Sequence, residues 1–567
     1  MPVKSFANNS YRSIFKWGDP AQTNEPNKRL IKYLKEHMAV SDDDIRTPHL
    51  PGLEEVRLER PTALAKKDIS ALEKIVGAEN IELTDYERLR HSAGYSYYDV
   101  ISLRKQADVP LIDVVVYPRD EDDVVAIVKF CDKRRIPLIP FGGRSSVTRG
   151  LEPIHGGISL DFTRHMKRIR NVNEINKSVT VEPGIFGPEY EEYLNNYKTP
   201  LAPGGYSNGH FPQSFEYSTV GGWVVTCGAG GLSTGYGKIE DMVLGLRFVT
   251  PKGIMEIKDY PRTATGPDLR RIVAGSEGAF GVLTEVTLKI WQFRPENRSY
   301  FSFLFKNMDD GVRALREIMQ GEFGLPHMLR LSDPEETGIG FMIEGINGGV
   351  IDKFFARLGY VDGQRCLLMG STEGDKDAGR LIKKKSKAIG RKYGGFSLGS
   401  IAVKSCHKHR YADPYLRENL MDMKVMTDTI ETATTWDNLP KLWAEVRKVV
   451  KARPHSICMC HASHSYENGT MLYFIFISKI IPGDEVHDYL DYHSAILNAI
   501  AANGGSPSHH HGVGRMMAPW LENFTGKANM DLLRAIKKHL DPKNIMNPGG
   551  TIALDYSGEK NKAFRAD

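Results

Sequence analysis

The stretch Pro140-Phe-Gly-Gly-Arg-Ser-Ser-Val147 directly follows a short apolar run at Ile136–Pro140. Upstream, Ile112–Val116 predicts a buried strand and Asp120–Arg134 predicts a helix with one apolar face. Strand, helix, strand and glycine turn in this order predict a βαβ unit. Glycines and small hydroxyl residues after a strand let backbone N–H groups crowd around a diphosphate. A plain strand-exit turn would explain this one segment equally well.

Two more segments of small residues follow. Residues 217–230 read Tyr-Ser-Thr-Val-Gly-Gly-Trp-Val-Val-Thr-Cys-Gly-Ala-Gly, and Gly275–Gly281 precedes a predicted strand at Val282–Ile290. Tight packing of strands is the structural explanation for either segment alone. Three such segments, each expected beside a strand, instead predict close backbone approach to one large planar ligand.

Composition narrows the function classes. The chain has 567 residues, of which 41% are hydrophobic and 26% charged, which predicts a soluble protein of several domains. A net charge of +5, spread along the chain without an aromatic-basic pattern, argues against nucleic-acid binding. The six cysteines form neither a disulfide framework nor a zinc-ligand spacing, so no metal site is expected.

The termini and the apolar runs bear on location. The N-terminus has no apolar core of a signal peptide, and the last residues are not a peroxisomal Ser-Lys-Leu signal. The longest apolar runs are too short to cross a bilayer. We therefore expect a cytoplasmic protein, with peripheral membrane contact left open.

The pattern of polar, apolar and glycine residues along the chain predicts four regions. Residues 1–108 are polar and mostly helical in pattern, and residues 109–293 carry the glycine segments. Residues 294–485 mix helices and strands like a separate α+β domain. Residues 486–567 hold a long helix, a histidine-rich loop at 504–515 and a closing segment.

Four stretches, Pro140–Val147, Ser218–Trp223, Gly266–Asp268 and Gly275–Glu285, resemble the FAD-binding domain of the vanillyl-alcohol oxidase / p-cresol methylhydroxylase (PCMH) superfamily. The resemblance runs from about residue 90 to the C-terminus. It implies an α+β protein with a two-subdomain PCMH-type FAD-binding domain and an α+β cap domain of the FAD-linked oxidase C-terminal type. The cofactor would be FAD. The chain has no convincing Rossmann fingerprint, in agreement with that family.

By position, the resemblance implies that Pro140–Ser146 holds the diphosphate and that 214–219 and 226–229 line the isoalloxazine and ribityl chain. The segment 275–281 would help to cradle the adenosine half. The implied cofactor-binding residues are Pro140, Phe141, Gly142, Gly143, Arg144, Ser145, Ser146, Ser214, Ser218, Thr219, Gly222, Thr226, Gly228, Ala229, Gly275, Ser276, Glu277, Gly278 and Gly281.

One position departs from the family pattern. Arg144 stands where a third glycine is usual, and Ser145 stands where threonine is usual. If that glycine takes a positive φ, Arg144 costs about 1 kcal/mol. A guanidinium facing the diphosphate would offset this cost.

Two branches of the superfamily compete. Dehydrogenases or oxidases of D-2-hydroxy acids or alcohols typically carry Gly-Glu-His-Gly and a His-x-Gly-Asp-Gly-Asn-x-His metal motif. Here the first region reads Gly504-Gly-Ser-Pro-Ser-His-His-His-Gly-Val-Gly514. The second reads Cys460-His-Ala-Ser-His-Ser-Tyr-Glu-Asn-Gly-Thr-Met-Leu-Tyr-Phe474, so the metal motif is absent.

The other branch is alkyldihydroxyacetonephosphate synthase. The chain is similar to it in the triplet His509–His511 followed by Gly-Val-Gly and Arg515, and in Arg417 before Glu431–Trp436. Further similarities are Tyr473 in Leu-Tyr-Phe-Ile-Phe, Arg330 in Leu-Arg-Leu-Ser-Asp, and the stretch Lys16–Pro20.

This branch implies that the acyl chain of acyl-dihydroxyacetone phosphate is exchanged for a long-chain fatty alcohol, without net redox change. A base removes a C1 proton, flavin N5 bonds to C1 and expels the carboxylate, and the alcohol then attacks. Tyr473 matches the base, whose pKa the histidines and Arg417 would lower. Arg417 matches the residue that holds the leaving carboxylate.

The remaining implied roles concern substrate and assembly. His509, His510 and His511 would polarise or orient the substrate, and Arg330 and Arg515 would bind it, with Arg330 a candidate for the phosphate or for ordering the site. The resemblance also implies a dimer, and the fatty substrates make 330–400 a candidate membrane contact.

Each residue also has an ordinary structural explanation. A tyrosine in an apolar β run, like Tyr473, packs in the core by default, and Arg417 in a helical pattern pairs with an exposed neighbour. A histidine triplet can be a zinc site, although consecutive residues cannot all face one metal. In a strand, His510 would face away from the other two histidines. A third hypothesis is a protein that binds flavin but catalyses no reaction.

Overall fold

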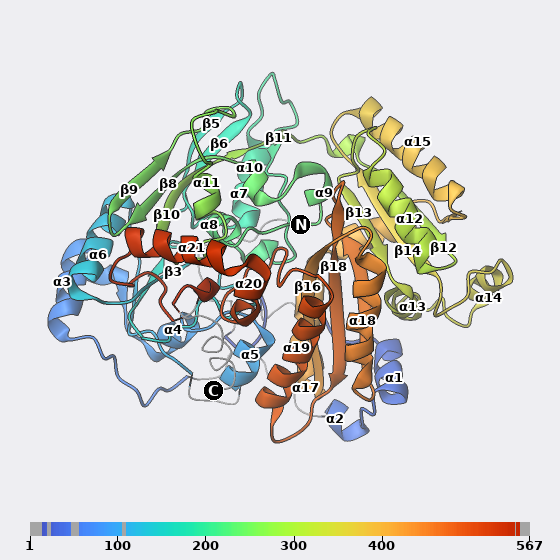
Figure 1. Ribbon diagram of the computed structural model, residues 1–567, viewed down its shortest axis with the longest axis horizontal. Coiled ribbons are helices and arrows are strands. Elements are labelled where there is room, and N and C mark those ends of the chain that lie inside the picture. Colours follow the sequence, from blue (N-terminus) through green and yellow to red (C-terminus); the bar gives the residue numbers. More distant parts are fainter. Residues whose placement is uncertain (1–13, 20–23, 47–55, 105–108, 550, 556–567) are drawn as a thin grey trace.

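The computed structural model describes residues 14–19, 24–46, 56–104, 109–549 and 551–555. Figure 1 shows two lobes side by side, a first lobe drawn mainly in blue to green and a second in yellow to orange, with the red C-terminal helices between and across them. The first lobe contains two separate sheets and the second is built on one large sheet.

The first sheet of the first lobe has four strands in the order β1-β2-β4-β3. Strands β2 and β3 both run parallel to β4, which lies between them, so β2, α6 and β3 form the predicted βαβ unit. The side chain of Asp120 accepts the N–H of Asp123 and starts α6, and Arg135 ends it in a left-handed conformation. The elements are β1 Ile81–Glu82, β2 Val114–Val116, β3 Leu138–Phe141, β4 Ile158–Asp161, α3 Lys66–Val76, α4 Asp85–Arg90, α5 Tyr97–Arg104 and α6 Glu121–Arg134.

The second sheet of this lobe is antiparallel, with five strands in the order β5-β6-β10-β8-β9. Its strands are β5 Ile169–Asn173, β6 Ser178–Val181, β8 Val243–Thr250, β9 Gly253–Ile257 and β10 Val282–Lys289. Around it lie α7 Gly187–Asn196, α8 Val220–Val225, α9 Ser233–Tyr236, α10 Ile239–Met242, α11 Arg270–Val273 and the pair β7 Tyr206–Ser207 and β11 Trp291–Gln292. Within the segment 217–230, Val220–Val225 form the short helix α8, which packs against strand β10 as expected, and the side chain of Thr219 caps its N-terminus.

The second lobe is a seven-stranded antiparallel sheet in the order β15-β12-β14-β13-β17-β18-β16. Its strands are β12 Ser299–Phe305, β13 Met328–Ser332, β14 Cys366–Thr372, β15 Phe396–Ser397, β16 Val425–Thr435, β17 Ile457–Ser463 and β18 Gly469–Lys479. Its helices are α12 Met308–Met319, α13 Pro334–Ile343, α14 Val350–Arg357, α15 Lys376–Lys392, α16 Ile401–His409, α17 Asp413–Asp422, α18 Leu439–Ala452 and α19 Glu485–Ala502. The predicted α+β fold, with a two-sheet lobe and a separate cap, is confirmed.

The described residues between 14 and 104 do not lie together as one helical region. Helices α1 (Lys28–His37) and α2 (Asp42–Arg46) lie beside the cap, where Leu34 and Met38 share a core with strands β16 to β18. Strand β1 instead extends the first sheet of the other lobe, because its backbone pairs with β2. The similarity at Lys16–Pro20 can be followed only to Asp19, since Pro20 lies outside the described residues.

The C-terminal segment connects the lobes. Helix α19 packs against α18 and α5, whereas α20 (Ala518–Thr525) and α21 (Lys527–Leu540) return across the first lobe. The chain then pairs with β3, where Leu138 N donates to Ile545 O at 2.8 Å and Asn547 N donates to Leu138 O at 2.9 Å. The histidine-rich loop between α19 and α20 therefore lies between the two lobes.

Candidate active site

The three glycine-containing segments meet in the first lobe. A Cβ atom on Gly143 would collide with the backbone oxygen of Tyr217, so the first segment lies directly against the second. A Cβ atom on Gly278 would lie 2.9 Å from Pro140 Cδ, so the third segment lies against the first. Because these close approaches need glycine, the segments form one continuous backbone surface.

The second and third segments are also joined by their backbones. Gly275 N donates to Val224 O at 3.3 Å and Glu277 N donates to Val225 O at 2.9 Å, at the end of α8. Two of the hydroxyls that were expected to contact the cofactor form hydrogen bonds within the second segment. Ser218 Oγ accepts the indole N–H of Trp223 at 2.7 Å, and Thr226 Oγ1 donates to Gly222 O at 2.8 Å.

Buried polar atoms beside these segments indicate where a ligand contributes contacts. Ser276 Oγ and Asn547 Oδ1 are buried without a hydrogen-bond partner among the described residues. The amide of Asn547 donates to Gly150 O and Glu277 O, which places both orphaned atoms at the third segment. Since an unpaired buried polar group costs about 1–3 kcal/mol, a polar ligand here is favoured. The segments therefore fit a large cofactor with polar groups.

His210 is a further unpaired group that the sequence did not single out. Both of its ring nitrogens are buried without a partner among the described residues, and its ring lies 4.8 Å from that of Trp223. A Cβ on Gly228 would lie 3.3 Å from His210 Nε2, so the ring faces the second segment. Burial lowers the pKa of His210 to about 3, which keeps the imidazole neutral.

Arg144 has the positive φ that was expected, but a different set of contacts offsets its cost. Its φ is +64°, so the residue occupies a conformation that glycine adopts more easily. The expected contact of its guanidinium with a diphosphate is not what the structure shows. The group is buried, donates to the carbonyl oxygens of Ala93 at 2.9 Å and Ile14 at 3.1 Å, and stacks over Tyr95. It anchors the N-terminal segment.

The second lobe presents its candidate residues on neighbouring strands. Tyr473 on β18 pairs with Glu431 on β16 and with His461 on β17, so the three side chains share one face of the sheet. The ring of Tyr473 stacks on His461 with centroids 5.0 Å apart. Its hydroxyl donates to Thr429 Oγ1 at 3.1 Å.

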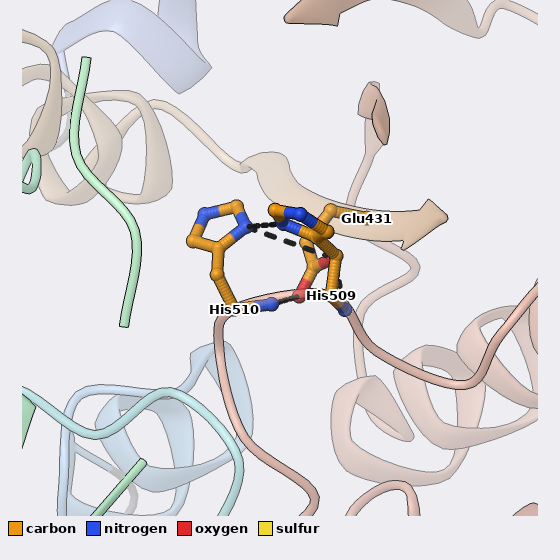
Figure 2. Close-up of side chains that lie close together, drawn as sticks. All are labelled: Glu431, His509 and His510. Carbon is orange, nitrogen blue, oxygen red and sulfur yellow. Dashed lines mark hydrogen bonds and ion pairs between the residues drawn. The ribbon is translucent and has the colours of Figure 1, made fainter. Parts of the chain in front are cut away.

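The histidine triplet lies in a loop and not in a strand, so the expected alternation of its side chains does not apply. The carboxylate of Glu431 fixes this loop. Its Oε1 accepts from Ser508 Oγ at 2.7 Å, His510 N at 3.0 Å and His511 N at 2.9 Å. Its Oε2 accepts from His509 N at 2.5 Å. Figure 2 shows Glu431 directly beside the two imidazoles of His509 and His510.

A second carboxylate holds the other end of the loop. Glu277, expected at the adenosine half of the cofactor, directs its side chain to the backbone after the triplet. Its two oxygens accept from Val513 N at 2.6 Å and Gly514 N at 2.7 Å. One glutamate from each lobe therefore fixes the histidine loop.

The electrostatics of the two glutamates differ. Although burial alone would raise it, neighbouring His511 and the loop N–H donors hold the pKa of Glu431 at about 2. Burial raises the pKa of Glu277 to about 7, against the opposing effect of its two N–H donors. Glu431 is thus ionised throughout the physiological range, whereas Glu277 titrates within it.

The pKa of Tyr473 is raised, not lowered as the sequence led us to expect. Burial raises the pKa of Tyr473, the hydrogen bond from its hydroxyl to Thr429 opposes this, and Asp428 and Glu431 add to the rise. Burial first, and then repulsion by neighbouring histidines and Lys238, lowers the pKa of His509 and His510 well below that of a free histidine. These imidazoles are therefore neutral and do not supply the positive charge that the sequence led us to expect.

Arg330 lies on the same face of the sheet as His461, because Ser332, two residues further along β13, pairs with His461, whereas Arg417 lies on α17, which packs against the edge strand β16. On α17, Arg417 is held by its neighbour Glu418, with Nε 2.7 Å and a terminal nitrogen 2.6 Å from Glu418 Oε1. On β13, Arg330 donates to Glu336, whose Oε1 lies 3.1 Å from His461 Nδ1. Arg330 thus fixes the imidazole on which Tyr473 stacks, and an ordering role describes it better than a direct substrate contact.

Arg515 has other partners than the expected substrate. Its buried guanidinium donates to the backbone oxygens of Arg149 at 3.0 Å, Pro548 at 2.9 Å and Gly549 at 2.8 Å. Burial lowers its pKa to about 10. We place Arg515 in the scaffold that joins the histidine loop to the C-terminal segment.

Glu431, His509 and His510 are close enough to hold a metal ion, with ligand atoms within 4.8 Å of one another. Both oxygens of Glu431 already accept N–H or O–H donors, and His509 Nδ1 lies 3.1 Å from His510 Nδ1. These contacts give the cluster a structural explanation that requires no ion.

Sequence reasoning missed the role of several residues. Glu431 was noticed only as part of a shared stretch, and His461, His464 and Tyr466 only as part of the region where the metal motif is absent. Alternation along β16 and β17 was the available signal, because it places residues 429, 431 and 461 on one face.

The fold and the site define a flavoprotein of the PCMH type with a cap of the FAD-linked oxidase kind. Residues 112–257 match the family described as "FAD binding domain", and residues 294–551 match "FAD linked oxidases, C-terminal domain". FAD is the cofactor. A solved p-cresol methylhydroxylase shares the fold, with a TM-score of 0.64 at 14% identity over 87% of this chain and 98% of that chain.

Nearer relatives define the branch. The chain is 33% identical to an alkyldihydroxyacetonephosphate synthase of Dictyostelium discoideum over 85% of this chain and 80% of that protein. A solved alkyldihydroxyacetonephosphate synthase superimposes with a TM-score of 0.80 and 28% identity over 95% of this chain and 98% of that one. The chain belongs to the alkyldihydroxyacetonephosphate synthase family.

Proposed function

We propose that the protein exchanges the acyl chain of acyl-dihydroxyacetone phosphate for a long-chain fatty alcohol. The products are an alkyl ether and a free fatty acid, in ether-lipid synthesis. The observation that carries the proposal is the pairing of Tyr473 with Glu431, which places the tyrosine beside the clamped histidine loop. The alternative, a dehydrogenase of D-2-hydroxy acids or alcohols, has no comparable support.

FAD would be held by the backbone of the three glycine segments and by Ser276 and Asn547, and it would supply an electron-poor ring to the reaction. Tyr473 removes the C1 proton, and Thr429 positions its hydroxyl. Since burial raises the pKa of Tyr473, its hydroxyl holds a proton at neutral pH and must release it before it can act as the base. Arg417, held in place by Glu418, receives the leaving carboxylate.

The test is an assay of the FAD-loaded enzyme with acyl-dihydroxyacetone phosphate and a labelled long-chain alcohol. We expect one ether and one fatty acid per turnover, with no electrons passed to a dye and with the oxidised flavin spectrum recovered once the substrate is consumed. Rapid anaerobic bleaching by a D-2-hydroxy acid, with electrons passed to a dye and no ether formed, would overturn the proposal in favour of the dehydrogenase.

The fatty substrates also require access from a lipid phase, and one surface of the cap suits this. Among the described residues, no helix is both long and apolar enough to cross a membrane. Helix α14 at the outer edge of the cap exposes Val350 by 85%, Ile351 by 56% and Phe354 by 50%. The same helix also exposes Lys353 and Arg357. Apolar side chains beside cations are typical of a surface that lies on an anionic membrane.

Flotation with anionic vesicles tests this surface. We expect V350S/F354S to lose most vesicle binding and to keep activity on dispersed substrate. Ile175→Ser is the matched control, because Ile175 is 78% exposed in the other lobe. Equal binding by wild type and V350S/F354S would contradict peripheral contact through α14. A homodimer is a separate proposal from the family resemblance, and light scattering of the holoenzyme tests it.

A further inference from the structure

Three side chains form a hydrogen-bonded chain that leads away from the histidine loop. Tyr466 Oη lies 2.7 Å from His509 Nε2, and His509 Nδ1 lies 3.1 Å from His510 Nδ1. Figure 2 shows the contact between the two imidazoles. At the inner end, the ring of His510 stacks 6.0 Å from that of Tyr473.

The outer end of the chain reaches the surface. Tyr466 lies in the turn between β17 and β18 and is only partly buried. The next two residues of this turn, Glu467 and Asn468, are exposed. The chain therefore runs from the inner face of the sheet, beside the proposed base, to a turn that water can reach.

The protonation states of the three groups allow two arrangements. Burial keeps His509 and His510 neutral and raises the pKa of Tyr466, so each group carries one proton at neutral pH. In one arrangement every hydrogen bond points outward, from His510 to His509 to Tyr466. In the other every hydrogen bond points inward. A chain with two such directions can pass a proton along its length.

The proposed reaction needs such a path. An ester and an alcohol give an ether, a carboxylate and one proton, and this proton comes from the alcohol hydroxyl. It is released between the lobes, where the neighbouring carboxylate Glu431 is fully engaged and holds its pKa at about 2. A buried site that releases a proton at each turnover must export it.

We propose that His510, His509 and Tyr466 form the exit path for the proton of the alcohol. His510 Nε2 accepts the proton from the hydroxyl, and the proton on His510 Nδ1 passes to His509 Nδ1. The proton on His509 Nε2 passes to Tyr466 Oη, whose own proton goes to water. Four protons move by one position each, and exchange with water after product release restores the first arrangement. The assignment rests on the proposed alkyl transfer.

Glu431 is the positioning residue of this path. Its carboxylate fixes the backbone N–H of both His509 and His510, so the two rings keep the distance that proton transfer needs. Lys238 Nζ adds to this by donating to His509 O at 2.6 Å. Neither residue exchanges a proton itself.

The experiment compares Tyr466→Phe with Tyr492→Phe in the FAD-loaded enzyme. The control also removes one buried hydroxyl, which donates to Val450 O at 2.9 Å, but Tyr492 lies outside the hydrogen-bonded chain. We expect Tyr466→Phe to lower kcat about 10- to 100-fold with little change in KM, since a proton-transfer step typically contributes 10²–10⁴-fold. The solvent deuterium isotope effect on kcat should rise. Tyr492→Phe should change neither.

A second variant, Tyr466→Ala, tests the path by chemical rescue. Imidazole buffer should restore its kcat in proportion to the buffer concentration and leave Tyr492→Phe unaffected. Wild-type kcat in Tyr466→Phe together with no buffer dependence in Tyr466→Ala would overturn the path while leaving alkyl transfer intact. If the wild type forms no ether at all, the proposed function fails, and the path fails with it.

Discussion

Glu431 and Tyr473 face each other across the neighbouring strands β16 and β18. This pairing joins the residue that fixes the histidine loop to the residue proposed to take the C1 proton. Because both stand on one rigid sheet, the loop and the base keep a constant separation.

Replacing Glu431 by Gln should disturb the loop more than the fold. The amide NH2 would face an N–H donor of the loop, and an unpaired buried donor costs about 1–3 kcal/mol. We expect kcat to fall about 100-fold, with FAD content within a few per cent of wild type. Glu317→Gln is the control, since its partners Lys392 and Tyr393 lie on the far side of the cap. Full activity in Glu431→Gln would show that the loop needs no carboxylate.

Tyr473→Phe should lower kcat about 10³-fold, within the range for removal of a general base. Within the described part of the chain, the hydroxyl makes a single hydrogen bond, to Thr429, so stability should change by about 1 kcal/mol or less. Exchange of the C1 hydrogen with solvent deuterium, followed by mass spectrometry, separates loss of the base from loss of binding. Undiminished exchange would exclude Tyr473 as the base.

Arg417→Lys keeps the charge but loses the forked guanidinium, so kcat/KM for the acyl substrate should fall about 100-fold. Arg453→Lys is a matched control, because Arg453 forms a two-pronged pair with Asp488, with distances of 2.7 Å, away from the proposed site. Equal effects of the two substitutions on kcat/KM would argue against a role for Arg417 in holding the carboxylate.

Glu277 should give stability a pH dependence near neutrality. Its pKa is about 7 in the folded protein against an ordinary value of 4.5, so the folded state keeps a proton that the unfolded chain has released between these values. Stability from this group therefore falls as the pH rises from about 4.5 to 7 and is constant above that. The Tm of the wild-type holoenzyme should fall by a few degrees relative to Glu277→Gln across this range. Parallel Tm curves would contradict the assignment.

Arg144→Gly should destabilise the protein even though glycine suits the positive φ. The backbone gain is about 1 kcal/mol, whereas the buried carbonyl oxygens of Ala93 and Ile14 lose a charged donor, which is worth about 1.5–3 kcal/mol for such a bond. Differential scanning calorimetry of the holoenzyme should show a lower Tm. A higher Tm in Arg144→Gly would mean that the strain outweighs the anchoring hydrogen bonds.

The sequence predicted the parts of the fold that depend on local pattern. The strand at Ile112–Val116, the helix at Asp120–Arg134 and the strand at Ile136–Pro140 follow from periodicity, and the structure has them as β2, α6 and β3. The three glycine segments were expected to meet, and they do, because glycine marks close backbone approach. Residues 1–108 divided between the lobes because β1 finds its partner in β2, a pairing that the polar pattern does not encode.

The site was predictable only in its residue types. Tyr473, Arg417 and the histidines were found by resemblance, but their electrostatics depend on burial, which leaves the imidazoles of His509 and His510 neutral. Glu431 was missed because its partners are backbone N–H groups almost 80 positions away, and backbone donors look the same at every residue. The guanidinium of Arg144 was expected to face the diphosphate. Its acceptors are instead carbonyl oxygens in the N-terminal part of the chain, which the sequence around Arg144 does not reveal.

The histidine loop has one glutamate from each lobe, and this limits how the lobes can be recombined. A chimaera that takes its flavin lobe from one family member and its cap from another would inherit Glu277 and Glu431 from different parents. Its loop could be seated only if the spacing of the two carboxylates were the same in both parents. The loop can therefore fold correctly only when the two lobes match in the spacing of these carboxylates. Active chimaeras should be those that exchange the loop together with both glutamates.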